Sequence, residues 1–247
     1  VVIGMLDPNR TIQGDGVWML HEAGIKLSFF ESDLLDKLTD LNREFIKLHR
    51  ITNWLPPAEL RRLDDWYNVV NSIFLDRNFQ RSPAWMFSHL VEVIGGLSSI
   101  ASKKAKPGMT VENFLPKCFG WWFALCGVVG IRSVEAMIWG KFPGCCPYCR
   151  LRPHDTAICS GAKKESRNPH WSSLASRAGE RIIPSSINDW KTLFAEIFPR
   201  TEGETLQWAF ARLSEELGEL AECIRVFDVV PTAFLSEAAD VFAWLMK

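Results

Sequence analysis

Residues 208–245 read WAFARLSEELGELAECIRVFDVVPTAFLSEAADVFAWL, and this stretch decides how the rest of the chain is interpreted. Its apolar residues recur at steps of three and four on both sides of Pro231, which is the period of a helix with one buried face. The positions are Phe210, Leu213, Leu217, Leu220 and Ile224 before the proline and Phe234, Ala238, Val241, Phe242 and Leu245 after it. The sequence therefore predicts two amphipathic helices joined by a short break.

Each of these predicted helices carries two acidic residues three positions apart. The pairs are Glu216 with Glu219 and Glu237 with Asp240. Side chains at i and i+3 share a helix face, so two antiparallel helices would bring four carboxylates to one place. Such a cluster is costly unless cations neutralise it, and hard oxygen ligands suit Mg²⁺ or Mn²⁺. A solvated acidic face on an ordinary helical hairpin is the alternative.

The pattern E-E-x-x-E, a spacer and E-x-x-D resembles the signature of the all-α nucleoside triphosphate pyrophosphatases, the MazG and dimeric dUTPase group. Here the pattern is carried by Glu215, Glu216, Glu219, Glu237 and Asp240. The resemblance implies that these residues hold magnesium ions, two or so, which activate water against the phosphate chain of a nucleotide. It makes Glu216 and Glu219 the candidate catalytic carboxylates, with Glu219 as acceptor of the water's proton. Arg212 and Trp208, one or two turns before Glu215, are candidates for contact with phosphate and base, although a tryptophan there also suits a core.

An internal repeat links this stretch to the first half of the chain. Residues 65–125 align with residues 189–245. The matched pairs are Asp65 with Asp189, Trp66 with Trp190, Ile73 with Ile197, Phe74 with Phe198, Trp85 with Trp208, Phe87 with Phe210, Leu90 with Leu213, Glu92 with Glu215, Gly95 with Gly218, Leu97 with Leu220, Phe114 with Phe234 and Leu115 with Leu235. The four acidic residues of the second copy are replaced in the first by Val93, Gly96, Lys117 and Gly120, which cannot hold a metal. The resemblance therefore implies a fused tandem of MazG-like helical repeats, degenerate over residues 59–139 and with a metal site over residues 187–247. Chance alignment of helical hairpins rich in Trp and Phe is the alternative.

Between the two copies, residues 145–159 read CCPYCRLRPHDTAIC and hold a second set of potential ligands. Cys146, Cys149, His154 and Cys159 stand in C-x2-C-x4-H-x4-C spacing. Three thiolates and an imidazole at these intervals can close a tetrahedral structural zinc site, with Cys145 as a spare thiol. The spacing equals that of a zinc knuckle, a module that contacts single-stranded nucleic acid, but the usual glycines are replaced by Arg150, Arg152 and Pro153. We expect a structural zinc in a loop over residues 140–172, with scattered buried cysteines as the alternative.

The first 50 residues alternate in the α/β manner. Strands are expected at residues 1–5 and 25–29, a turn at residues 7–9, and a helix that opens with Ser32 as its N-cap and buries a stripe of leucines and Phe45. This order, with the segments DPN, GDG, HEAGI and LNREF, resembles the C-terminal part of the cytidine/deoxycytidylate and riboflavin-pathway deaminase fold. The deaminase zinc signature, His-x-Glu followed by Pro-Cys-x-x-Cys, occurs nowhere in the sequence, so we expect no deamination. A generic strand–helix–strand scaffold fits the same pattern.

The longest uncharged run, residues 118–131, is shorter than the roughly 20 residues that span a bilayer. It predicts a buried helix rather than a membrane span, continuing to residue 139 with Arg132 and Glu135 as an exposed pair. Seven cysteines, an odd number, without a secretory signal indicate a reducing, cytoplasmic setting rather than a disulfide framework. The net charge of −1 points to no partner, but the basic stretch 141–182 beside the acidic C-terminal stretch could face phosphates.

Together these observations predict a mainly α protein, a helical-bundle tandem with a small zinc-binding loop and a short N-terminal α/β segment. The leading function is a Mg²⁺-dependent nucleoside triphosphate pyrophosphohydrolase that releases pyrophosphate from a (deoxy)nucleotide. A deaminase-like neighbour would suit a pyrimidine such as dUTP or dCTP, because deamination of dCTP makes dUTP. A catalytically inactive MazG-like scaffold and a nucleic-acid-binding module run by the zinc loop are the alternatives, and the oligomeric state, including a homo-oligomer, stays open. Both ends of the chain suggest a fragment of a longer protein.

Overall fold

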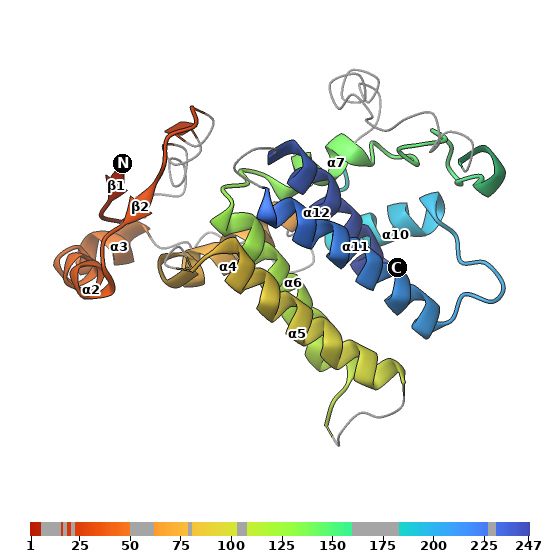
Figure 1. Ribbon diagram of the computed structural model, residues 1–247, viewed down its shortest axis with the longest axis horizontal. Helices are drawn as coiled ribbons and strands as arrows, with labels where there is room; N and C mark the ends of the chain where they lie inside the picture. The colour runs from red at the N-terminus through yellow and green to blue at the C-terminus, as the bar shows by residue number, and fades with distance from the viewer. Residues whose placement is uncertain are drawn as a thin grey trace.

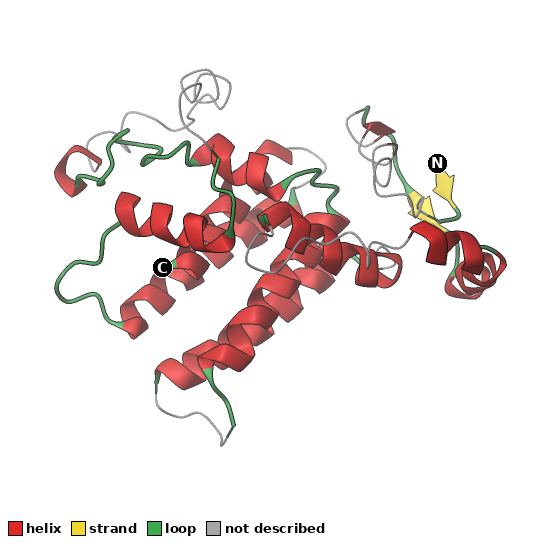
Figure 2. Cartoon of the chain, turned by 180° about the vertical axis from the view of Figure 1, so that it is seen from behind, coloured by secondary structure: helices red, strands yellow, loops and turns green. Residues whose placement is uncertain are grey.

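The chain folds mainly into helices, which confirms the predicted mainly α class. The computed structural model describes residues 1–5, 16, 19–20, 23–49, 62–78, 81–102, 108–159, 183–226 and 231–247. The labelled elements of these ranges are β1 (Val2–Ile3), β2 (Ser28–Phe29), α2 (Ser32–Leu41), α3 (Arg43–His49), α4 (Leu63–Asn78), α5 (Pro83–Ala101), α6 (Val111–Val128), α7 (Val134–Lys141), α10 (Ile187–Ile197), α11 (Leu206–Arg225) and α12 (Pro231–Met246). Figure 2 shows the two short strands confined to the N-terminal segment.

The main body is built from two sets of three helices that pack in the same pattern. In the first set α6 packs against both α4 and α5, and in the second set α12 packs against both α10 and α11. The sets meet where α5 contacts α11 and α6 contacts α12 (Figure 1). Exchanging α4, α5 and α6 with α10, α11 and α12 leaves each of these contacts in place. This symmetry is what a repeated three-helix unit would produce; that the unit is MazG-like stays a prediction.

Hydroxyl caps begin the equivalent helices α5 and α11. Ser82 Oγ accepts the backbone N–H of Trp85 at 3.2 Å, and Thr205 Oγ1 accepts that of Trp208 at 3.1 Å. Such a cap satisfies a backbone donor that the first helical turn leaves without a partner. The two caps occupy the same position in the two aligned segments, as the predicted repeat requires.

Aromatic side chains from both sets meet in one core. Trp122 on α6, Trp190 on α10 and Phe242 on α12 are fully buried. The ring centroid of Phe242 lies 5.2 Å from that of Trp122 and 6.0 Å from that of Trp190. The indole Nε1–H of Trp122 donates to the carbonyl oxygen of Ala238 at 3.0 Å. This bond satisfies the buried indole and ties α6 to α12.

The apolar run at residues 118–131 forms a buried helix as predicted, but the helix ends sooner than expected. Helix α6 stops at Val128, and Gly130 follows with a φ of 83°, a left-handed conformation that suits glycine. Helix α7 starts afresh at Val134. The prediction of one helix continuing to residue 139 is therefore wrong.

Glu135 is buried and caps α4, which corrects its prediction as part of an exposed pair. Its side chain accepts a hydrogen bond from the backbone N–H of Leu63 at 2.9 Å and pairs with Arg62. Glu135 as a whole is 1% exposed. In return, Asp64 accepts the backbone N–H of Glu135 at 3.1 Å and the hydroxyl of Ser133 at 2.6 Å. Each helix caps the other, and this holds α7 in place beside α4.

Helix α5 is the one helix of the described ranges that is long and apolar enough to cross a membrane. A single such helix is weak evidence, because a helix in the core of a soluble protein meets the same criteria. Helix α5 packs against α6 and α11 and buries Met86, Leu90 and Ile94.

The N-terminal segment holds the two strands and lies beside the helical body in Figure 1. Strands β1 and β2 pair in parallel, with Val2 opposite Ser28 and Ile3 opposite Phe29. Parallel pairing across a connection agrees with the predicted α/β character. The strands are shorter than expected, and the predicted turn at residues 7–9 lies outside the described residues.

The long helix predicted from Ser32 is two helices, because the chain leaves the helical path at Asn42. The backbone N–H and the side-chain amide of Asn42 both donate to the carbonyl oxygen of Leu38, at 3.0 Å and 2.9 Å, and close the C-terminal end of α2. The residue at the N-cap is Glu31 rather than Ser32. The expected buried stripe is also wrong in part, since Leu41 is 84% exposed.

Replacing Trp122 by Phe should lower the free energy of unfolding by about 2 kcal/mol, because it leaves a void and removes the donor to Ala238. Urea unfolding followed by circular dichroism measures the change. Trp121→Phe, on the same helix but at a half-buried position, is the matched control and should cost less than about 1 kcal/mol. Equal losses of unfolding free energy in the two variants would show that the contact of Trp122 with α12 adds no stability beyond that of an ordinary half-buried tryptophan.

Candidate functional site

Three of the predicted metal-ligating carboxylates converge between α11 and α12. One oxygen each of Glu216, Glu219 and Glu237 lies within 4.8 Å of the others, so this group could hold a metal ion. Glu216 and Glu219 share the face of α11 next to its buried leucine stripe, which turns them toward α12. The side chain of Glu216 is only 12% exposed, whereas Glu219 is the most exposed of the three. The i, i+3 spacing thus produces the expected convergence for these three residues.

The fourth carboxylate, that of Asp240, is paired with a lysine. Lys141, the last residue of α7, donates to the carboxylate of Asp240, to the hydroxyl of Ser236 at 2.8 Å and to the carbonyl oxygen of Ser236 at 3.1 Å. The lysine is 2% exposed. Sequence reasoning counted Lys141 in a basic stretch but missed it as a site residue. The sequence does indicate that Lys141 is buried, because it follows Met137 by four positions and Ile138 by three and so continues an apolar helix face.

Burial raises the pKa of all four carboxyl groups. For Asp240 burial raises the pKa to about 6, even though Lys141 acts in the opposite direction. For Glu216, burial and then the charge of Glu219 raise the pKa. For Glu219, burial and then Glu237 do so, and for Glu237 burial dominates, with Lys141 opposing it. The ionised cluster is therefore destabilised, and a bound cation would relieve that cost.

One oxygen of this cluster also lacks a hydrogen-bond partner. Glu237 Oε2 is buried, and nothing in the described parts of the chain donates to it. A buried carboxylate oxygen left in this way is costly unless a cation or a proton satisfies it. This is the kind of donor atom that a metal ion would use.

Glu215, the first residue of the acidic motif, lines the same pocket but is not part of the group formed by Glu216, Glu219 and Glu237. Its side chain is 50% exposed and pairs with Arg212 on the preceding turn of α11. Arg212 also approaches Glu216, with 3.9 Å between Nη2 and Oε1. Glu215 therefore orients Arg212 rather than joining the carboxylates of Glu216, Glu219 and Glu237.

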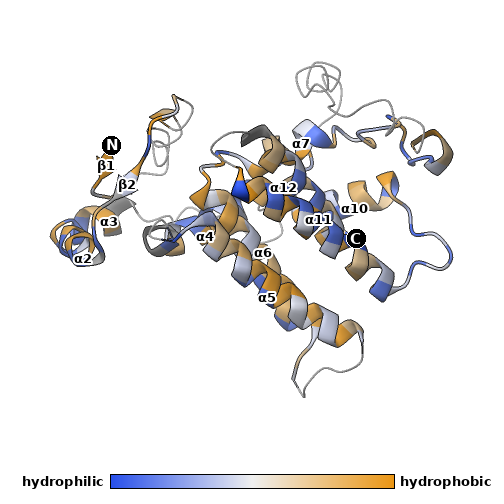
Figure 3. Cartoon of the chain, in the orientation of Figure 1, coloured by the Kyte–Doolittle hydropathy of each residue, from blue (hydrophilic) through white to orange (hydrophobic). Residues whose placement is uncertain are grey.

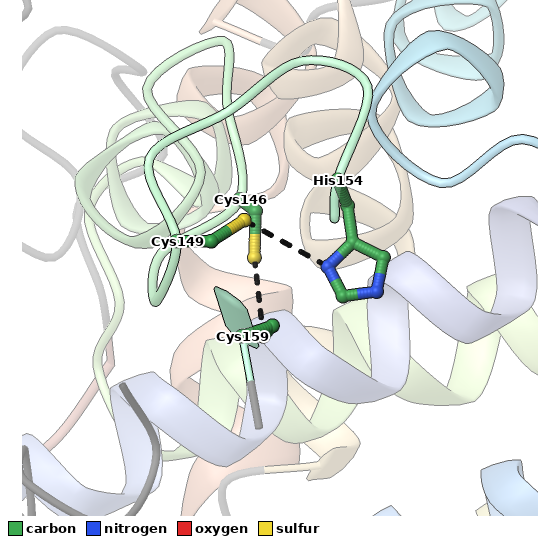
Figure 4. Close-up of side chains that lie close together, drawn as sticks. All are labelled: Cys146, Cys149, His154 and Cys159. Atoms are coloured by element: carbon green, nitrogen blue, oxygen red, sulfur yellow. Dashed lines mark hydrogen bonds between the residues drawn. The ribbon is translucent and has the colours of Figure 1, made fainter. Parts of the chain in front are cut away.

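The Cys/His loop forms a second cluster of potential ligands, which could hold a metal such as zinc. One atom each of Cys146, Cys149, His154 and Cys159 lies within 4.8 Å of the others (Figure 4). The sulfurs of Cys146 and Cys159 are 3.9 Å apart, and the sulfur of Cys149 lies 3.8 Å from His154 Nδ1. Around a tetrahedral zinc with Zn–S bonds of ~2.3 Å, ligand atoms are separated by ~3.5–3.8 Å. The four predicted ligands therefore already lie at nearly the right spacing.

Backbone hydrogen bonds shape this loop and attach it to the second set of helices. The N–H of Cys146 donates to Leu151 O at 3.1 Å, and Arg150 adopts a φ of 64° in the turn between them. The N–H of His154 donates to Ile197 O at 2.8 Å, at the end of α10. Burial raises the pKa of the Cys146 thiol to about 12, so holding zinc there requires the metal itself to displace the proton.

Residues of both ligand clusters line one pocket of about 800 Å³. The loop and the helices α11 and α12 all contribute to its lining. The lining residues from the loop include Cys146, Pro147, Tyr148, His154 and Cys159, and those from the helices include Glu216, Glu219 and Asp240. Tyr148 lies close enough to the carboxylates that they add to burial in raising its pKa. The Cys/His loop is thus part of the pocket and not only a connection between the two copies.

Aromatic and cationic side chains line the pocket away from the Cys/His loop. The rings of Trp208 and Trp244 meet edge-on at 5.4 Å between centroids, and Trp208 is 40% exposed. The guanidinium of Arg212 lies 5.8 Å, and the ammonium of Lys247 5.1 Å, from the ring centroid of Trp244. Lys247 pairs with Glu204 at 2.9 Å. The two predicted substrate residues, Arg212 and Trp208, therefore both line the same pocket as the carboxylates.

The corresponding place in the first copy is filled by an aromatic ring. A Cβ atom built on Gly96, the counterpart of Glu219, would lie 2.2 Å from the ring of Phe114. The ammonium of Lys117, the counterpart of Glu237, lies 4.8 Å from the centroid of the same ring. Figure 3 shows α5 as more apolar than its counterpart α11. The first copy thus has packing where the second has carboxylates.

No protein-family model, curated protein or solved structure matches this chain. The MazG-like and deaminase-like resemblances therefore rest on the residues of the chain alone.

Cys149→Ser should reduce the zinc content of the purified protein from about one equivalent to below ~0.2, because three ligands hold zinc far less tightly than four. Elemental analysis after dialysis measures this. Cys145→Ser is the matched control, since Cys145 is a buried neighbour outside the four-ligand group, and it should retain zinc. Loss of zinc in the Cys145 variant alone would mean that Cys145 replaces a predicted ligand.

Without added divalent cations, Glu216→Gln should stabilise the protein at neutral pH. A carboxyl group whose pKa is raised on folding contributes stability below its unfolded pKa and loses it as the pH rises through the folded value; for Asp240 this range is 3.8 to about 6. Glu216, whose pKa is raised too, follows the same sign. The variant should melt roughly 2 °C higher at pH 7.5, the size given by about 1 kcal/mol in a chain of this length. Thermal melts should show the difference shrinking toward pH 5, and a less stable variant at pH 7.5 would contradict the reasoning.

Proposed function

We propose that this chain is a Mg²⁺-dependent nucleoside triphosphate pyrophosphohydrolase of the MazG and dimeric dUTPase type. The observation that carries the proposal is the convergence of Glu216, Glu219 and Glu237, two of which, Glu216 and Glu219, line a pocket of about 800 Å³. That volume falls in the range of small-molecule sites, roughly 300–1,000 Å³. The same pocket offers cations for phosphates and indole rings for a base.

The donor set fits a hard divalent cation. Glu216, Glu219 and Glu237 would hold Mg²⁺ or Mn²⁺ through carboxylate oxygens, and the buried, unpartnered Oε2 of Glu237 supports this fit. Bound magnesium would neutralise phosphate charge and lower the pKa of a water molecule. Zinc in the Cys/His loop would be structural, because all four positions around it are filled by protein ligands.

We assign the remaining roles to residues of the pocket by their positions. Glu219, the most exposed of the three carboxylates, accepts the proton of the water whose oxygen bonds to phosphorus. The phosphorus–oxygen bond to the leaving pyrophosphate breaks in the same step, which leaves a nucleoside monophosphate. Arg212, held by Glu215, lies beside Glu216 and binds the phosphate chain. Trp208 offers its exposed ring to the base.

The substrate we propose is a pyrimidine deoxynucleotide of the dUTP or dCTP type. This rests on the deaminase-like N-terminal segment, because deamination and triphosphate hydrolysis act on the same nucleotides. All seven cysteines are free thiols in the described residues, and we propose a cytoplasmic location in which they stay reduced. A homo-oligomer is part of the same proposal.

The Cys/His loop fits the pocket better than it fits nucleic acid. Arg152 pairs with Glu196 at 3.0 Å, and three of the loop's four ligands line the pocket. We therefore assign the loop to the pocket wall. Binding of single-stranded RNA or DNA that weakens steeply with salt would instead support a nucleic-acid-binding module.

Pyrophosphate release from a panel of NTPs and dNTPs with Mg²⁺ tests the function. One nucleotide should release pyrophosphate, and Glu216→Gln should lower its kcat/KM by about 100-fold or more, because the charge that holds the cation is lost. Glu222→Gln is the matched control on the same helix, with a side chain 74% exposed and outside the cluster, and it should keep full activity. Bound metal without turnover of any nucleotide would identify the chain as an inactive scaffold.

A further inference from the structure

Lys141 uses its whole hydrogen-bonding capacity inside the carboxylate site. A lysine ammonium has three donors, and the three acceptors it meets are the carboxylate of Asp240, the hydroxyl of Ser236 and the carbonyl oxygen of Ser236. The side chain is 2% exposed, so it has no room to swing out to solvent. The ammonium is therefore a fixed charge of the site and is not free to follow a substrate.

The helix that carries Lys141 is itself fixed. Helix α7 exchanges caps with α4 through Glu135 and Asp64, and it also packs against α12, which carries Asp240. The residue after the lysine, Phe142, is 3% exposed and packs edge-on against Phe194 at 5.2 Å between centroids. The core thus holds the ammonium beside α12.

The position of the ammonium makes it a partner of the whole acidic group. Besides its direct contact with Asp240, its charge opposes burial in setting the pKa of each of the four carboxyl groups at positions 216, 219, 237 and 240. The three oxygens that lie within 4.8 Å of one another belong to the other three residues and exclude Asp240. The acidic group is thus divided into one carboxylate neutralised by the lysine and three that face one another.

We propose that Lys141 is a resident cation of this site, so that the chain binds one divalent metal ion on Glu216, Glu219 and Glu237 while Asp240 is held by the lysine. The inference rests on the proposed function, since it concerns the same metal site. Lys141 is a positioning residue: it occupies the carboxylate that a second metal ion would need. One divalent ion with Lys141 nearly balances four carboxylates, whereas two ions with Lys141 would make the site positive before any nucleotide enters.

Counting bound Mn²⁺ by electron paramagnetic resonance tests the inference on the full chain. Wild type should bind one Mn²⁺ per chain, and Lys141→Met, which removes the charge and keeps the length, should bind two because Asp240 is released. Lys141→Arg should return the count to one. Two Mn²⁺ in the wild type, or one in Lys141→Met, would overturn the inference. If Lys141 had only a structural role, its replacement by Met would not create a second metal site.

Asp240→Asn gives an independent answer if Lys141→Met does not fold. The variant should still bind one Mn²⁺, because Asp240 is not a ligand in the proposed arrangement; loss of the ion would overturn it. Glu237→Gln is the comparison and should weaken Mn²⁺ binding by about tenfold or more, as loss of a ligand does. Absence of Mn²⁺ from the wild type would remove the proposed function together with the inference, whereas two ions with normal turnover would remove the inference alone.

Discussion

The buried contact between α6 and α12 is the constraint on which the other features of the helical body depend. Trp122 reaches from the first set of helices into the second and donates to Ala238, between the two acidic residues of α12. That bond and the ring of Phe242 beside it set the rotation of α12 about its axis. Once the rotation is fixed, Glu237 and Asp240 must face away from the aromatic core, one toward α11 and the other toward α7. The packing of the aromatic core thus orients the carboxylates of α12.

Carboxylates oriented in this way lower the stability of the protein when they are ionised. Four carboxyl groups lie in a place where burial raises the pKa of each, and one oxygen of Glu237 has no donor. Structures keep such unfavourable groups where the surrounding packing over-determines them. Here the surrounding packing is the aromatic core on one side and the capped helix α7 on the other. The strained part of the molecule and its candidate chemistry therefore coincide, as they commonly do at functional sites.

Local spacing predicted much of this arrangement, and long-range contacts produced the rest. The helical period around Leu213 and Phe242 and the spacing of Glu216 and Glu219 are properties of neighbouring residues, so the sequence alone predicted the two helices and their shared acidic face. The spacing of Cys146 and Cys149 worked in the same way. Lys141 joins Asp240 across 99 positions, and no local pattern encodes such a pairing. The helix break at Asn42 was not predicted for a different reason: it falls inside a good apolar stripe, and the period of the apolar residues does not reveal such a break.

The two segments of the predicted repeat differ in what occupies one position on the equivalent helices α5 and α11. At the position of Glu219 the first copy has Gly96, and the missing side chain lets Phe114 lie directly on the backbone of α5. A glutamate there would have to displace the ring, and a ring there leaves no space for a cation. The counterpart of Phe114 in the second copy, Phe234, is fully buried instead, which leaves the face of α11 open for its carboxylates. Metal binding and close packing therefore exclude each other at this position, and the loop with the Cys/His cluster lines a pocket with the segment that carries the carboxylates.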